Sequence, residues 1–170
     1  TALQPDNTFS PAFRAIWQAV AAGIPADGDA LAHLEPLTQW LVARGREQSA
    51  RQLSESLTAL AMFERSVIRQ FRKFDAVLTP ALAMTPRPIG WYDSEDAEHN
   101  FAQQVQYTPF TSFVNASGLP AITLPVAVTE KGIPMGVQLI GRPGGEHVLL
   151  SLGAQLERHL RWQDRHPPQW

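Results

Sequence analysis

Cysteine is absent from the sequence. Its absence excludes disulfide bridges, zinc sites built on thiolates and a cysteine nucleophile together. It is also consistent with a reducing compartment, and we expect a cytoplasmic protein. No apolar run reaches the about 18 residues that a membrane-spanning helix requires, so no membrane partner is expected.

An excess of charge of one sign is also lacking. Lys and Arg together number 14, Asp and Glu number 16, and the net charge is −2. A nucleic-acid-binding surface needs a basic patch. Arg44, Arg46 and Arg51 cluster only loosely, and Glu47 and Glu55 interleave with them. This pattern is typical of a solvated helix face, so no nucleic-acid partner is expected.

Local catalytic motifs are missing as well. The chain contains neither a G-x-S-x-G nor an S-x-x-K motif. Its only lysines are Lys73, at the polar end of a predicted helix, and Lys131, in a predicted hairpin loop. Neither place provides the desolvation that would lower a lysine pKa enough for a base. The five histidines form no H-x-x-x-H or H-E-x-x-H pair, so neither a metal ion nor a cofactor is expected.

Two polar features remain as candidates for chemistry. Ser117 lies in the stretch 115–125, NASGLPAITLP, but no base accompanies it. A polar residue at a turn from helix to strand explains it better than a nucleophile does. Carboxylates cluster in the Pro-rich segment after residue 84, at Asp93, Glu95, Asp96 and Glu98. We interpret them as a solvated, mobile acidic loop rather than as the rigid acid pair of a glycosidase.

The first part of the chain, residues 1–73, is predicted to be mainly helical. Ser10 and Pro11 are typical of a helix start, and Gly23 and Pro25 of its end. A second short helix is expected from Pro36, and a long one follows Ser49. The expected apolar stripes are Phe13, Ile16, Trp17 and Val20 on the first helix, and Leu53, Leu57, Leu60, Val67, Ile68 and Phe71 on the long one.

Residues 74–160 are predicted to contain the strands, a loop and further helices. The apolar run 75–82, DAVLTPAL, suggests a strand buried on both faces. Alternation over 122–128 and 135–139 predicts two more strands, which the loop 129–134 joins as a hairpin. Helices are expected over 97–107, near 109–117 and over 146–160, and Gly118 ends the second of these. The chain is therefore α/β, and a sheet of three strands under so many apolar helices suggests an incomplete layer.

Three blocks of sequence are similar to the C-terminal part of amidase signature family enzymes. They are FDAVLTPALAMTP, YTPFTSFVNASGLPAITLPVAVTEKGIPMGVQLIGRPGGEHVLLSLGAQLE and WQDRHPP. The resemblance implies an α/β/α sandwich around a mixed sheet. It also implies hydrolysis of linear amides by a Ser–cis-Ser–Lys triad, through an acyl-enzyme.

The triad itself is not expected in this chain. In the family it belongs to a Gly- and Ser-rich segment and to a lysine upstream, and this sequence contains neither motif. The first residue is Thr1 rather than Met, which suggests an internal start. We therefore expect a C-terminal segment that is inactive alone and that works with the missing N-terminal half of an amidase on a small amide substrate. Self-association of the exposed sheet, as a homo-oligomer, is also expected.

The resemblance also implies which residues border the substrate. They are Thr79, Pro80, Ala81, Leu82 and Met84 at the end of the first predicted strand, together with Asn115 and Gln138. For Asn115 and Gln138 an alternative stays open, an amide that hydrogen-bonds to backbone at a turn or strand. Trp91 and Tyr92 either shape the pocket for the acyl or leaving group or pack on the surface. None of these residues is expected to be catalytic.

Two alternative functions remain open from the sequence. The chain is either part of an amidase, or a non-catalytic interaction or scaffold piece. The longer protein, in turn, is either a general amidase or the A-type subunit of a tRNA-dependent amidotransferase. The WQDRHPP and YTPFTSF blocks favour the general amidase.

Overall fold

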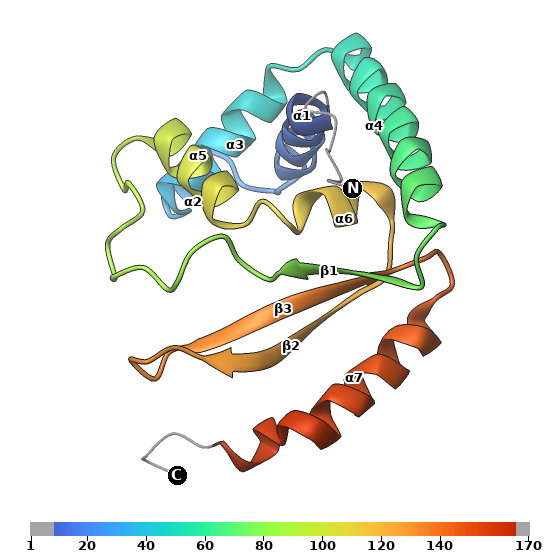
Figure 1. Ribbon diagram of the computed structural model, residues 1–170. Helices are drawn as coiled ribbons and strands as arrows, with labels where there is room; N and C mark the ends of the chain where they lie inside the picture. Colours follow the sequence, from blue (N-terminus) through green and yellow to red (C-terminus); the bar gives the residue numbers. More distant parts are fainter. Residues whose placement is uncertain (1–8, 166–170) are drawn as a thin grey trace. The chain divides into compact units, whose positions relative to one another are not determined.

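The computed structural model describes residues 9–165, which divide into two compact units (Figure 1). The first unit comprises residues 9–65 and 87–107, and the second comprises residues 66–86 and 108–165. The longest helix, α4 (Ala50–Phe71), continues from the first unit into the second. Among the described residues, none of the helices combines the length and the apolar character that crossing a bilayer requires.

The first unit is helical, as predicted. It contains α1 (Phe9–Ala21), α2 (Asp29–Ala32), α3 (Pro36–Arg46), most of α4, and α5 (Ala97–Tyr107). Proline at the start of α3 suits a position whose N–H has no helical partner. The core consists of Ala21, Leu41, Val42 and Phe101, with Ile24, Leu31, Leu37 and Trp40 packed against it. The side chains of α1, α3 and α5 thus meet in one apolar cluster.

Helices α1 and α3 come very close to each other at Gly45. A Cβ atom on Gly45 would lie 1.9 Å from the carbonyl oxygen of Gln18 and 2.9 Å from the Cβ of Ala22. Only glycine fits this crossing without moving a helix backbone.

This crossing corrects the apolar stripe predicted for α1. Val20 is 70% exposed, whereas the buried residues of α1 are Ala12, Gln18 and Ala21. Small residues and one amide thus face the neighbouring helices, and at Gly45 the close approach leaves no room for a larger side chain. Ser10 is itself helical within α1, so it is not the N-cap that the sequence suggested.

The second unit contains the sheet. Its elements are β1 (Ala76–Pro80), α6 (Ser112–Ser117), β2 (Ala121–Val128), β3 (Pro134–Gly141), α7 (Glu146–Leu160) and the 3₁₀ turn η1 (Trp162–Asp164). The strand order is β1-β3-β2, and both pairs are antiparallel. The α/β class, the hairpin of β2 and β3, and the last helix are confirmed. The pairing of β1 with β3 joins segments far apart in the sequence.

Local backbone features mark where the helices and strands of this unit end or become irregular. Gly118 has φ of 61°, and its N–H caps the end of α6, as the sequence predicted. Helix α7 packs on β2 and β3, where Leu124, Leu139 and Leu149 form the core. The register between β2 and β3 shifts between Leu124 and Ala127, which ends the regular alternation there.

The prediction that the first strand is buried on both faces was wrong for this chain. Strand β1 pairs only with β3, and Leu78 in its middle is 63% exposed. The reason is that α7 packs on β2 and β3.

Candidate functional site

All seven residues that the sequence associates with substrate lie in the second unit. Thr79 and Pro80 are the last residues of β1, and Gln138 lies on β3 directly opposite Thr79. The other four predicted residues are Ala81, Leu82 and Met84, which follow the strand, and Asn115 on α6.

Gln138 ties the end of β1 to the segment before α6. Its side chain is only 4% exposed. Its Nε2 donates a hydrogen bond to the Oγ1 of Thr79 at 3.2 Å and another to the carbonyl oxygen of Phe110 at 2.9 Å. Because this buried amide donates one hydrogen bond to each of the two segments, it fixes their positions relative to each other.

The exit of the chain from β1 is set by a second contact. The N–H of Ala81 donates to the carbonyl oxygen of Gly136 at 3.1 Å. Gly136 lies close to Ala81, Leu124 and Thr123, whose nearest atoms a Cβ at position 136 would meet at 3.4 Å. Beyond it, Leu82 is 37% exposed and Met84 is half-buried. The segment from Thr79 to Met84 is therefore anchored at its start, and it presents apolar side chains at the surface.

Asn115 is not brought into this arrangement. It is exposed on α6, and its side chain makes no hydrogen bond to any other described residue. For Gln138, the alternative of an amide bonded to backbone agrees with the structure, because the Phe110 carbonyl is one of its acceptors. That contact does not conflict with a place beside a substrate.

The seven residues of this site offer groups that can bind a ligand. None of the seven residues carries an acid, a base or a cysteine thiol. The Thr79 hydroxyl accepts from Gln138, which leaves its own proton for donation to another acceptor. Across residues 9–165, no three His, Cys, Asp or Glu side chains are grouped so that they could hold a metal ion.

The interpretation of Ser117 as a structural residue agrees with its surroundings. It is 1% exposed, and its hydroxyl donates to the carbonyl oxygens of Phe113 at 2.8 Å and Val114 at 3.2 Å. These are bonds within its own helix, of the kind that serine often forms near a helix end.

The acidic cluster at residues 93–98 of the first unit is hydrogen-bonded to α5, so it is not the mobile loop that the sequence suggested. Asp93 accepts hydrogen bonds from the backbone of Glu95 and of Asp96, both at 2.9 Å, and it contacts His99 at the same distance. These donors, first the Asp96 N–H, then the His99 side chain and the Glu95 N–H, lower the pKa of Asp93 from 3.8 to about 2. The network orders the segment before α5 and explains the acidic run without catalysis.

Trp91 and Tyr92 also belong to the first unit. Their ring centroids lie 5.0 Å apart, and each packs near Tyr107, at 6.2 and 6.5 Å. Of the two roles left open, the packed cluster favours the structural one.

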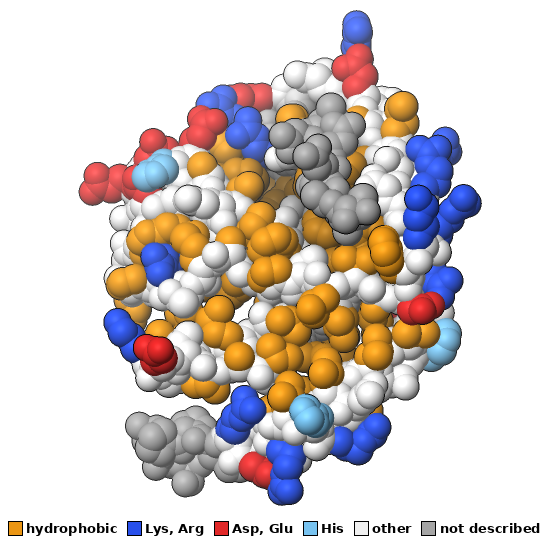
Figure 2. Space-filling view, in the orientation of Figure 1, with side chains coloured by type: hydrophobic (Ala, Val, Ile, Leu, Met, Phe, Trp, Pro, Cys, Tyr) orange, Lys and Arg blue, Asp and Glu red, His pale blue; other side chains and the backbone are white. Residues whose placement is uncertain are grey.

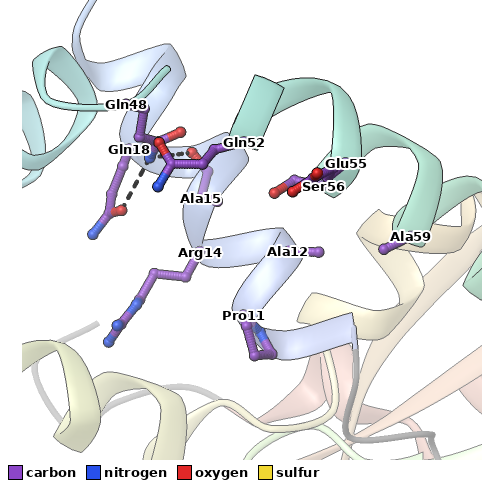
Figure 3. A pocket seen from close by; sticks show the side chains of 10 residues that line it. All are labelled: Pro11, Ala12, Arg14, Ala15, Gln18, Gln48, Gln52, Glu55, Ser56 and Ala59. Carbon is purple, nitrogen blue, oxygen red and sulfur yellow. Dashed lines mark hydrogen bonds between the residues drawn. The ribbon is translucent and has the colours of Figure 1, made fainter. Parts of the chain in front are cut away.

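An open hollow of about 450 Å³, lined by both polar and apolar groups, lies between α1 and α4 in the first unit (Figure 3). Gln48 donates to the carbonyl oxygen of Ala15 at 2.9 Å and to the Oε1 of Gln18 at 3.1 Å. Its own Oε1 is buried and has no partner among the described residues. Glu55 at the rim is already paired with Arg51 at 2.8 Å. The hollow thus has one buried acceptor left for a donor such as water.

Sequence reasoning missed two contacts in the second unit. One is the hydrogen bond from Gln138 to the carbonyl of Phe110, because a pattern of side chains does not reveal a backbone acceptor. The other is the ion pair between Asp75 and Arg142, which joins the residue before β1 to the residue after β3. A register for the strands would have predicted this pair, but the register depends on a pairing across about sixty residues of chain.

Comparisons with known proteins agree on one family. The family model described as Amidase matches residues 30–150. AmiB2 of Mycobacterium tuberculosis is 35% identical over 148 residues, which cover 85% of this chain and 32% of that protein. The fatty acid amide hydrolase of Oryza sativa subsp. indica is 38% identical over 87 residues, which cover 51% of this chain and 14% of that protein.

Solved structures give the same result. The structure of 6-aminohexanoate cyclic dimer hydrolase matches with a TM-score of 0.85 at 25% identity, over 99% of this chain and 39% of that one. A bacterial aryl acylamidase of the amidase signature family matches in fold with a TM-score of 0.67 at 21% identity, over 94% of this chain and 36% of that one. The chain spans about a third of the length of the curated relatives that it matches.

Proposed function

Because the chain belongs to the amidase family, we propose that it forms one wall of the substrate site in an enzyme that hydrolyses linear carboxylic amides. The products are an acid and ammonia or an amine. In this proposal a Ser–cis-Ser–Lys triad, supplied outside this chain, attacks the amide carbonyl and forms an acyl-enzyme, which water then hydrolyses. The rest of the amidase domain is the partner, and the cytoplasm is the compartment.

The observation that carries the proposal is the arrangement around Gln138. The buried amide holds Thr79 and the Phe110 carbonyl in fixed positions at the end of β1. The residues that follow are apolar and partly exposed, and they contain no ionisable group. Such a wall suits a neutral amide: apolar contacts hold the acyl part, and the Thr79 hydroxyl offers one hydrogen bond.

The proposed division of labour has a direct test. The complete polypeptide that carries this chain is assayed for release of ammonia or amine from a panel of aliphatic and aryl amides, beside the 170-residue chain alone. We expect turnover by the complete polypeptide and none by the chain. Turnover by the chain alone, or no turnover by a folded complete polypeptide across the panel, would refute the proposal.

The role of the wall is tested separately in the complete polypeptide. Thr79→Val removes the hydroxyl but keeps the shape, and it is expected to raise KM several-fold with little change in kcat, because the wall binds substrate and transition state alike. Thr123→Val, on β2, is the matched control, since Thr123 also lies opposite Gln138. Equal effects of the two variants on KM would contradict a substrate role for Thr79.

A further inference from the structure

The turn between α1 and α2 contains Asp27-Gly28, the one place in the chain where an aspartate precedes a glycine. The carboxyl carbon of an aspartate side chain lies within reach of the amide nitrogen of the next residue, and a five-membered ring closes when the two join. Glycine has no Cβ to hinder that approach. Whether the ring can close in the folded protein depends on how free the Gly28 nitrogen and the Asp27 carboxylate are.

The amide nitrogen of Gly28 is free in the folded protein. Its N–H donates no hydrogen bond to any other described residue, whereas the nearby N–H of Ala30 donates to the carbonyl oxygen of Asp27 at 3.1 Å. A Cβ at position 28 would meet no atom within 4 Å, so the space beside the glycine is open. The φ of Gly28 is 51°, which glycine adopts without strain. The fold therefore leaves this nitrogen accessible to the side chain before it.

The carboxylate of Asp27 is exposed and has a single ion-pair partner among the described residues. Its side chain is 86% exposed, and its Oδ1 lies 2.9 Å from Nη1 of Arg46. Nη2 of Arg46 donates to the carbonyl oxygen of Ala26 at 2.9 Å, so Arg46 ties this turn to the end of α3. Charged side chains of both signs cover the surface over α3 and α5, at the upper left of Figure 2. Exposed ion pairs are weak, so this one opens readily to water.

The other aspartates of the described part of the chain lack this combination. Each of them precedes alanine, serine or arginine, whose Cβ crowds the amide nitrogen. Asp93 is restrained further, because its Oδ1 accepts the N–H groups of Glu95 and Asp96 at 2.9 Å. Asp29 is the closest comparison to Asp27, since it is also exposed and lies two residues away, but it precedes Ala30.

We propose that Asp27 is a site of spontaneous isomerisation to isoaspartate, and that the isomerisation releases the turn between α1 and α2 from Arg46. In the first step the Gly28 nitrogen gives up its proton and attacks the side-chain carboxyl carbon of Asp27. The new N–C bond forms, a C–O bond of the carboxyl group breaks, and one water molecule leaves, so that a succinimide ring results.

Water completes the modification in the second step. It cleaves the bond between the main-chain carbonyl carbon of Asp27 and the ring nitrogen, which keeps its bond to the side-chain carbon. The chain then runs through the side-chain carbon, and the former main-chain carbonyl becomes a free carboxylate. One water is lost and one is gained, so the product has the mass of the original protein.

The isomer changes both groups through which the turn is held. The carboxylate that pairs with Arg46 becomes a main-chain amide, and the carbonyl that accepts from Ala30 becomes a carboxylate. The backbone also gains one carbon beside Ala26, which is only 6% exposed and whose N–H donates to the carbonyl oxygen of Ile24 at 2.8 Å. We expect the turn to open more often as a result. This inference is independent of amide hydrolysis, because neither step uses the proposed substrate wall.

Ageing of the folded protein tests the site. The complete polypeptide that carries this chain is incubated at neutral pH under native conditions and then digested, and its peptides are fragmented by a method that distinguishes isoaspartate from aspartate. We expect isoaspartate at position 27 to accumulate several-fold faster than at position 29. Equal rates at the two positions would overturn the proposal.

A pair of arginine variants tests the contact that restrains the carboxylate. Arg46→Met frees the carboxylate and should speed the formation of isoaspartate at position 27 several-fold relative to position 29. Arg44→Met is the matched control, because Arg44 lies on the same helix and pairs with Glu47 at 3.2 Å rather than with the turn. Equal ratios of the two rates in both variants would overturn the assignment of Arg46 as the partner that is released.

Hydrogen exchange tests the consequence for the turn. The amide of Ala26 should exchange several-fold faster in aged protein that carries isoaspartate at position 27 than in fresh protein. Asp27→Glu keeps the charge but would have to close a larger ring, so its Ala26 amide should not change on ageing. Unchanged exchange in the isomerised protein would overturn the release of the turn. An equal change in aged Asp27→Glu would assign the effect to other damage and would overturn it as well.

Discussion

Replacing Gln138 by methionine tests the central contact of the candidate site. Methionine has a similar length and flexibility but donates no hydrogen bond. The change removes the bonds to Thr79 Oγ1 at 3.2 Å and to the Phe110 carbonyl at 2.9 Å. Each such bond contributes about 0.5–1.5 kcal/mol net. Because Phe110 is half-buried, water reaches its carbonyl and limits the penalty, so we expect a loss of about 2 kcal/mol in the free energy of unfolding.

A double-mutant cycle assigns part of this loss to the bond between Gln138 and Thr79. Thr79→Val keeps the branched shape and removes the hydroxyl. We expect a coupling energy of about 1 kcal/mol between the two substitutions. Thr123→Val is the control, because Thr123 lies opposite Gln138 on β2 and no hydrogen bond joins the two side chains. That second cycle should give a coupling near zero.

Native-state hydrogen exchange at the amides of β3 is the suitable assay. It reports on the second unit, whereas denaturation of the whole chain mixes both units. A coupling with Thr79 no larger than that with Thr123 would refute the reasoning. An unchanged exchange free energy for Gln138→Met would refute it as well.

Two further predictions concern the first unit. Gly45→Ala would place a Cβ 1.9 Å from the Gln18 carbonyl oxygen, and we expect a loss of about 3 kcal/mol or more in the free energy of unfolding. Gly23→Ala, whose nearest atom would be 3.3 Å away, should cost far less, and native-state hydrogen exchange at the amides of α3 compares the two variants. Equal losses would contradict the close crossing. Asp93, whose pKa is lowered from 3.8 to about 2, stabilises the fold above pH 3.8, and that contribution is lost as the pH falls toward 2. NMR titration should show this pKa, and His99→Ala should raise it only part of the way because the backbone donors remain; full recovery to 3.8 would assign the shift to His99 alone.

Much of the fold was predictable because the signals are local. Proline at the start of α3 and glycine after α6 set boundaries that depend only on backbone geometry. The hairpin of β2 and β3 follows from alternation on either side of a short loop with a glycine. The helix over 146–160 was predicted, and within it Leu149, Leu152 and Leu156 lie at helical spacing and pack in the core of the second unit.

The errors arose where another element decides burial. Val20 has the spacing of a core residue but is 70% exposed, whereas Ala12, Gln18 and Ala21 are the buried residues of α1. Leu78 has the sequence context of a buried strand but lies on an open edge. In both cases the residue is apolar and prefers burial. Whether another element packs on it is not encoded in the neighbouring sequence.

The candidate site divides in the same way. The family resemblance predicts that the residues around Thr79 and Gln138 border the substrate and that none of them is catalytic, and both statements stay predictions. It could not predict that Gln138 donates to the carbonyl of Phe110, or that Asn115 lies exposed on α6 and apart from that contact.

The sequence by itself determined the helices, the hairpin, the family and the absence of a local catalytic motif, because each depends on residue types at short spacing. Only the tertiary structure decided that β1 pairs with β3, that Gln138 joins Thr79 to Phe110, and that β1 is an edge strand among the described residues. The physical reason is that a strand edge and a buried amide are satisfied by partners distant in the chain. Which partner is present is settled by packing and hydrogen bonding together, rather than by local preference.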